Sequence, residues 1–78
     1  SLEDQALWED LRECRKQLSE EYNVPPYLIF HDATLKEMME SMPTTSSELL
    51  AITGIGESKL EKYGDEFLGI VRRHADLS

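Results

Sequence analysis

The first third of the chain carries the most regular pattern of apolar and polar positions. Apolar residues recur there at steps of three or four, at Leu7, Leu11, Cys14, Leu18 and Tyr22. This spacing places them on one face of an α-helix, with charged residues on the opposite face. The pattern therefore predicts an amphipathic helix over residues 4–22, whose charged face lies in solvent and whose Trp8 packs at the rim of the apolar stripe.

Two adjacent prolines end this helix, because Pro25 and Pro26 lack a backbone N–H and Pro25 disfavours the α conformation at Val24. The run over residues 27–30 that follows is apolar. No second segment alternates apolar and polar residues with the period of a strand, so a strand here would have no partner. We therefore expect residues 27–30 to form an irregular or 3₁₀ segment that plugs the core.

Two Thr-x-x-Glu sequences in the middle of the chain match the capping box, in which Thr caps a helix and Glu reaches back to the cap N–H. The first predicts a helix that begins near Thr34, with Asp32 as an alternative cap, and that ends at Pro43. The second predicts a short helix from Thr45 through Ile52.

The first of these two helices carries methionines at helical spacing, namely Met38, Met39 and Met42. Methionine side chains fill irregular gaps in protein cores, and they also form adaptable binding faces. The pattern favours core packing, with a binding face as the alternative.

Helical spacing of apolar residues resumes in the last third, at Leu60, Tyr63, Phe67, Ile70, Val71 and His74. Gly64 interrupts this pattern, and Asp65 is a suitable cap for a new helix, so we expect a break or a strong bend at Gly64. Together the elements predict an all-α fold, a compact bundle of about five short helices that forms one domain over residues 1–78.

The charge balance limits what such a small bundle can bind. The 78 residues contain 16 Asp and Glu against 8 Lys and Arg, which gives a net charge of −8. This excess repels nucleic-acid backbones and anionic membranes, so any contact with nucleic acid must be local. No apolar run is long enough to span a membrane, no signal peptide is recognisable, and Cys14 is a lone cysteine. We therefore expect a cytoplasmic protein.

The sequence offers no catalytic constellation. It lacks the phosphate-binding loop of NTPases, and its two histidines, His31 and His74, do not have the spacing of metal ligands. Cys14 lies on the apolar stripe of the first helix, where a thiol packs as a small hydrophobe. We expect no enzymatic activity, no metal and no cofactor in this chain itself.

A Gly-Ile-Gly turn, similar to that of a helix-hairpin-helix, precedes the last helix. Gly54 and Gly56 permit a sharp turn, and the isoleucine between them is expected to plug the turn into the core. The N–H groups of the following helix start, which includes Ser58, are able to donate hydrogen bonds to a phosphate, with Lys59 as the counter-charge. The alternative is a tight helix connection without a ligand, because Glu57 in the same turn repels anions.

The region around this turn is the least acidic part of the chain, which makes Lys59 and Lys62 candidates for contacts with nucleic acid. Further candidates on the first helix are Arg12, Arg15 and Lys16. Tyr27, held after two rigid prolines, is able to stack on a base. The alternative is that Tyr27 packs beside Leu28 and Phe30.

Short motifs in a definite order extend over nearly the whole chain. They are Asn23–Tyr27, Phe30–Leu35, Met42–Pro43, Gly54–Gly56 with Lys59, and Tyr63–Gly64 with Phe67–Leu68. In this order and spacing they resemble an HRDC domain, the helicase-and-RNase-D C-terminal module, in the form found in bacterial RecQ helicases. The resemblance implies a five-helix accessory domain that is tethered to an ATP-dependent 3′-to-5′ DNA helicase and tunes its recognition of DNA structure. It also implies a bacterial protein that is associated with the nucleoid when on DNA.

The resemblance also implies where nucleic acid binds. Weak contacts with single-stranded DNA are implied at the aromatic residue after the two prolines and at the basic residues near the Gly-Ile-Gly turn. The candidate nucleic-acid contacts are Tyr27, Gly54, Gly56, Ser58, Lys59 and Lys62.

Because this chain is acidic, a second hypothesis concerns a protein partner. An acidic surface is expected to dock on the basic helicase core or winged-helix domain of the same polypeptide, in a monomeric protein. The candidate residues of this surface are Glu57, Glu61, Asp65 and Glu66. An alternative reading of the whole chain is an accessory RNA-binding domain of an RNase D-like exoribonuclease.

Overall fold

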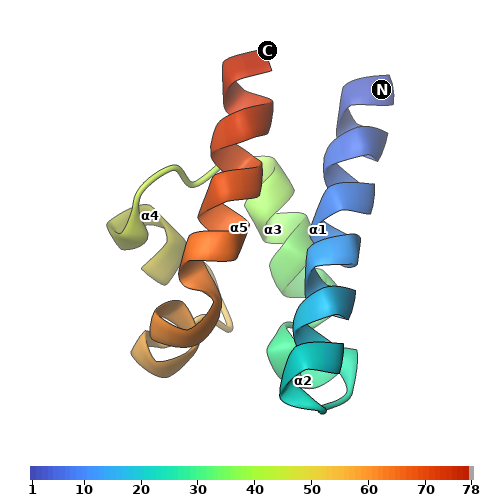
Figure 1. Cartoon of the computed structure of the whole chain (residues 1–78). Coiled ribbons are helices and arrows are strands. Elements are labelled where there is room, and N and C mark those ends of the chain that lie inside the picture. The colour runs from blue at the N-terminus through green and yellow to red at the C-terminus, as the bar shows by residue number, and fades with distance from the viewer. Residues whose placement is uncertain (78) are drawn as a thin grey trace.

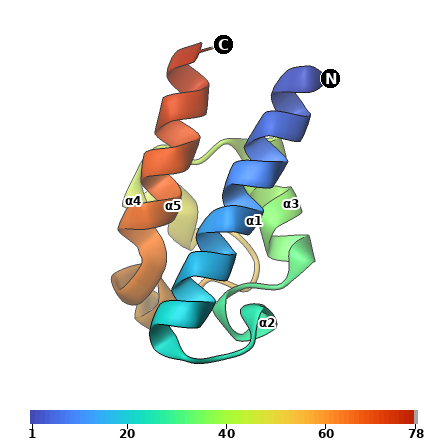
Figure 2. The ribbon, with the colours of Figure 1, turned by 45° about the vertical axis from the view of Figure 1, so that its right-hand side comes forward.

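The protein is a bundle of five helices, and the computed structural model describes residues 1–77 (Figure 1). The helices are α1 (Leu2–Tyr22), α2 (Pro26–Ile29), α3 (Asp32–Ser41), α4 (Ser46–Leu50) and α5 (Glu57–Leu77). The two long helices, α1 and α5, pack side by side, with both chain ends at one end of the bundle and α2 at the other (Figures 1 and 2). Residues 1–77 contain no strand, and the predicted all-α fold is confirmed.

Side chains from all five helices fill the core. Every member of the predicted α1 stripe is buried except Tyr22, whose ring packs edge-on against Tyr63 of α5. Phe30, just after α2, is also buried and lies edge-on to Phe67 at a ring distance of 5.0 Å. Trp8 is partly buried against the core, as its place at the rim of the stripe predicts.

The segment after the two prolines folds into one turn of α-helix, α2, rather than the expected irregular or 3₁₀ segment. Prolines are well suited to the start of a helix, where the first N–H groups have no helical partner. A helical turn also divides consecutive residues between two faces. Ile29 and Phe30 are buried, whereas Tyr27 and Leu28 are exposed, so only the second half of the predicted plug enters the core.

The predicted capping box at Thr34 is wrong, because α3 begins at Asp32 with His31 in the N-cap position. Thr34 lies inside the helix, and its hydroxyl donates a hydrogen bond to the C=O of Thr53 over 3.1 Å. The carboxylate of Glu37 accepts one from the N–H of Thr53 at 3.2 Å. Thr34 and Glu37, the expected capping pair, instead tie α3 to the loop before α5. The backbone groups of a loop have no partners within a helix, so they form hydrogen bonds with such side chains.

Thr45 caps α4 as predicted, and its Oγ1 accepts a hydrogen bond from the N–H of Glu48 at 3.1 Å. The carboxylate of Glu48 accepts hydrogen bonds from the N–H and the hydroxyl of Thr44. These bonds hold the pKa of Glu48 below its ordinary value. The helix ends at Leu50, earlier than the expected end at Ile52.

Of the expected break or bend at Gly64, the break does not occur, because α5 continues through Gly64 without interruption, and the helix curves in Figure 1. Gly64 is buried, and an added Cβ would lie 3.7 Å from Leu49 of α4 and 2.9 Å from Leu60. The glycine therefore leaves room for α4 to pack closely on α5. This packing offsets the low helix propensity of glycine, which amounts to about 1 kcal/mol relative to alanine.

One guanidinium group of α1 holds the junction between α2 and α3. Arg15 donates through Nη1 to the C=O of Phe30 at 2.9 Å, and its Nη2 lies 2.7 Å from Oδ1 of Asp32. The hydrogen bond from Arg15 is the main reason that the pKa of Asp32 lies below its ordinary value. The Arg15 side chain is only 12% exposed, and its contacts tie the end of α2 and the start of α3 to α1.

Gly54 is the glycine that the turn before α5 requires. Its φ of 93° is unfavourable for other residues, and an added Cβ would lie 2.6 Å from Oγ1 of Thr34. Gly54→Ser should lower the free energy of unfolding by roughly 1–3 kcal/mol, measured by chemical denaturation. Gly56→Ser is the matched control, because an added Cβ there has no atom within 4 Å and serine is favoured at an N-cap position. An equal loss in both variants would contradict the role of Gly54.

Arg15→Ala should flatten the dependence of stability on acid pH. Because folding lowers the pKa of Asp32, its carboxylate stabilises the fold above its ordinary pKa, and this contribution is lost as the pH falls through the folded value. Without Arg15 that pKa returns toward its ordinary value. Urea midpoints measured from neutral to acid pH should therefore start lower in Arg15→Ala and fall less steeply than in the wild type.

Glu48 also has a lowered pKa, but it contributes equally to both proteins and cancels in this comparison. If the two curves of midpoint against pH had the same slope, the assignment of the Asp32 shift to Arg15 would be wrong.

Candidate nucleic-acid interface

Tyr27 projects from α2 into solvent. Its side chain is 54% exposed, which favours the base-stacking alternative over packing beside Leu28 and Phe30. The ring stacks on that of His31 at a centroid distance of 6.0 Å and an interplanar angle of 29°. A shallow hollow beside the two rings is also lined by Arg15 and Asp32. Tyr27 therefore offers a flat ring at the edge of a hollow that contains a guanidinium group.

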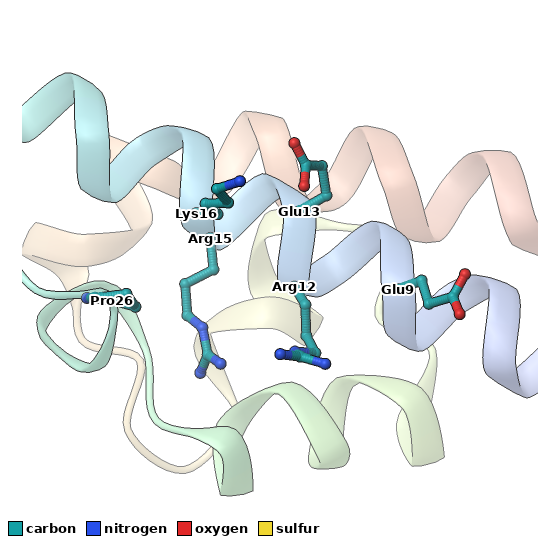
Figure 3. A pocket seen from close by; sticks show the side chains of 6 residues that line it. All are labelled: Glu9, Arg12, Glu13, Arg15, Lys16 and Pro26. Atoms are coloured by element: carbon teal, nitrogen blue, oxygen red, sulfur yellow. The ribbon is translucent and has the colours of Figure 1, made fainter.

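A second hollow adjoins the first along α1, and the two share Arg15 and Pro26. Figure 3 shows Arg12 and Arg15 extending to the same side of α1, toward α3, whereas Lys16 points to the other side. The guanidinium of Arg12 lies 5.9 Å from the centre of the Trp8 ring. The adjoining hollows form one surface, which we call the Tyr27 face. It carries Arg12, Arg15, Tyr27 and His31, and Lys16 borders it from the other side of α1.

Acidic groups reduce the positive potential of the Tyr27 face. Glu9 and Glu13 line the hollow along α1 (Figure 3). Arg15 is already engaged by Asp32, so a phosphate would compete with that carboxylate for its guanidinium. The arrangement suits a weak contact with a single strand, in which stacking supplements a few phosphate contacts.

The structure confirms part of the prediction for the Gly-Ile-Gly turn before α5. The side chain of Ile55 is buried and plugs the turn into the core. Gly56 occupies the start of α5, where its C=O accepts a hydrogen bond from the N–H of Leu60. Ser58 is exposed, but Lys59 is partly buried and its Nζ lies 5.9 Å from the centre of the Phe30 ring. Lys59 therefore covers the aromatic core as well as carrying a charge at the helix start.

The acidic candidate residues of α5 lie on the same exposed side of the helix as the basic candidate Lys62. Glu57, Glu61 and Asp65 are exposed and recur every fourth residue, which makes a row along the helix. Ser58, Lys62 and Glu66 form the neighbouring exposed row. Of the predicted nucleic-acid contacts, only Ser58 and Lys62 therefore share this exposed face of α5 with the predicted acidic surface, and acids predominate on it.

Tyr27 and the start of α5 lie at the same end of the bundle, opposite the chain ends (Figures 1 and 2). The contacts described for Tyr27 nevertheless involve α3 and the hollow beside α1, rather than Lys59 or Lys62. The cations brought to its side are those of α1, which the sequence offers only as additional candidates. The structural role of Arg15 was missed, because it lies in a charged run that has the pattern of a solvated helix face.

The remaining reactive side chains are engaged in packing or pairing. Burial raises the pKa of the Cys14 thiol to about 12, and the charge of Glu66 adds to the shift. Nε2 of His74 lies 2.7 Å from Oδ2 of Asp10, which links α5 to α1. Within residues 1–77 no group of three or more His, Cys, Asp or Glu is placed to hold a metal ion. In the same part of the chain, no helix is both long and apolar enough to cross a bilayer.

Comparison with known proteins gives one consistent result. The ATP-dependent DNA helicase RecQ of Haemophilus influenzae is 45% identical over 71 residues, which cover 91% of this chain and 12% of that helicase. The ATP-dependent DNA helicase UvrD2 of Mycobacterium tuberculosis (strain H37Rv) is 44% identical over 69 residues, or 88% of this chain and 10% of the relative. The chain thus spans only a small part of the curated relatives it matches.

The fold is also similar to that of a solved structure, the D. radiodurans RecQ HRDC domain 3. The TM-score is 0.88 with 33% sequence identity, and the match covers 94% of this chain and 96% of that domain. Residues 4–71 match the profile of the HRDC domain. The order of motifs, the five-helix bundle and these matches agree, and the chain belongs to the HRDC domain family.

Proposed function

We propose that the chain is an accessory regulatory domain of a RecQ-type DNA helicase, and that its Tyr27 face makes weak contacts with single-stranded DNA. The observation that carries this proposal is the exposed ring of Tyr27 beside the cations of α1. A base stacked on such a ring gains about 1–3 kcal/mol, whatever its sequence. Contacts of this kind suit a domain that adjusts how a motor holds DNA.

The proposed parent is an ATP-dependent helicase that acts on DNA in the bacterial cytoplasm, and the names of the relatives support it. The match to UvrD2 indicates that a domain of this kind also accompanies a helicase with a different name. An RNase D-like parent remains the alternative, and it predicts a preference for RNA over DNA of the same sequence.

The acidic face of α5 supports a second contact, with a protein surface. The row of Glu57, Glu61 and Asp65 is exposed and repels DNA. We propose that this row docks on a basic surface of the same helicase polypeptide, on the core or on a winged-helix domain, and so limits the access of DNA to that surface. Docking and DNA binding then use different faces of one small domain.

Tyr27→Ala should weaken binding of an oligothymidine to the isolated chain by roughly fivefold to a hundredfold at low salt, because a stacking contact is lost. Tyr27→Phe, which keeps the ring, should bind like the wild type. Fluorescence anisotropy with a labelled oligonucleotide measures both. Equal binding by all three proteins would contradict stacking, and tighter binding of the corresponding RNA would favour the RNase D-like alternative.

Arg12→Ala should also weaken DNA binding and make it less sensitive to salt, because one phosphate contact is removed. Arg73→Ala is the matched control, since it removes one exposed charge near the opposite end of the bundle. A similar loss of affinity in both variants would indicate that only net charge matters.

Asp65→Lys should raise the DNA affinity of the full-length helicase, because reversal of the charge releases the proposed docking contact. Glu40→Lys makes the same change of net charge on α3, outside the acidic row, and should have a much smaller effect. The measurement is a DNA titration of each full-length protein at the same ionic strength. If the two variants change affinity equally, the docking proposal fails, whereas the DNA contact of the isolated chain is unaffected.

A further inference from the structure

A second kind of surface lies at the opposite end of the bundle from Tyr27. There the first turns of α1, the end of α3 and the last turns of α5 surround a hollow of about 330 Å³. Its apolar wall consists of Ala6, Leu7, Met39 and Met42. The volume is at the lower end of the range for sites that bind small ligands or single anchoring side chains, about 300–1,000 Å³. We call this hollow the methionine groove.

The apolar wall of the groove combines a buried core side chain with partly buried methionine side chains. Leu7 is 3% exposed and belongs to the core, so it provides a rigid base. Met39 and Met42 are only partly buried and pack against the core from the rim. Unbranched, polarisable methionine side chains adapt to apolar groups of different shapes. Met38 of the predicted methionine stripe lies in the core. Met39 and Met42 line the groove instead, so the alternative interpretation of the stripe, a binding face, applies to these two residues.

The polar surroundings of the groove are negative. Glu3 and Asp4 of the first turn of α1 line it, and both are exposed. The C-terminal end of α3 also lies here, with Met42 as its C-cap and no basic residue in its last turn. A helix C-terminus carries a partial negative charge that favours cations. His74, which also lines the groove, has its Nε2 2.7 Å from Oδ2 of Asp10, so this nitrogen already has a carboxylate partner.

We propose that the methionine groove is a docking site for a basic amphipathic segment of a partner protein. A large apolar side chain of that segment inserts between Met39 and Met42, and a neighbouring Lys or Arg pairs with Glu3. Charge complementarity selects this occupant, because the negative rim excludes an acidic peptide and nucleic acid alike. The groove and the two hollows of the Tyr27 face have no lining residue in common, and α2, which carries Tyr27, lies at the other end of the bundle from the first turns of α1, so both can be occupied at once.

The test uses the chain itself and a labelled synthetic peptide with Leu and Lys at the spacing of an amphipathic helix. Binding is measured by fluorescence anisotropy, and a peptide with Glu in place of every Lys should not bind. Glu3→Lys should weaken binding about fivefold or more. Glu20→Lys is the matched control, because it reverses an exposed charge on the same helix outside the groove, and it should change affinity less than twofold by the same reasoning. The Ser1 amine lies 3.8 Å from Oδ2 of Asp4, so Glu3 is the better position for the test.

Met39→Lys should abolish binding of the Leu and Lys peptide while circular dichroism confirms that the helices remain. Equal weakening by Glu3→Lys and Glu20→Lys would overturn the proposal, because it would show non-specific attraction to an acidic protein. A dimer in sedimentation that Met39→Lys disrupts would also overturn it, in favour of a second copy of the chain.

Discussion

The hydrogen bonds of Arg15 hold the part of the molecule on which the candidate interface depends. Its guanidinium is largely removed from water and needs protein acceptors, which the C=O of Phe30 and the carboxylate of Asp32 supply. These bonds attach both sides of the α2–α3 junction to α1. Phe30, directly after α2, packs against Phe67 in the core, whereas Tyr27 of α2 is exposed to solvent.

Cationic, acidic and apolar side chains gather on different parts of the surface, and the net charge of the chain does not reveal this arrangement. The Tyr27 face gathers cations and aromatic rings at the end that contains α2, although the chain as a whole carries a charge of −8. The acidic row of Glu57, Glu61 and Asp65 lies on the exposed side of α5, and the methionine groove lies at the end where the chain begins and ends. These regions consist of different residues, so each can be altered by substitution without changing the others.

Local patterns in the sequence predict the helices and most of the core, because apolar spacing directly reflects which face is buried. The sequence predicts the role of a residue less well when that role depends on a contact with a residue far away along the chain. Thr34 has the sequence of a helix cap but bonds to the backbone of Thr53, and Gly64 resembles a helix end but provides room for Leu49. Likewise, no local signal separates the partly buried Arg15 from its exposed neighbour Lys16, so the composition of the Tyr27 face emerges only when α2 is placed against α1.

The most direct test of the proposed nucleic-acid interface is to locate bound DNA on the chain. Backbone amide chemical shifts of the isolated chain, followed by NMR during addition of an oligothymidine, report which residues the strand contacts. The largest changes are expected around Arg12, Arg15, Tyr27 and His31, with little change in the first turn of α1. Changes concentrated at Lys59 and Lys62, with the amides around Tyr27 unaffected, would contradict the proposed interface.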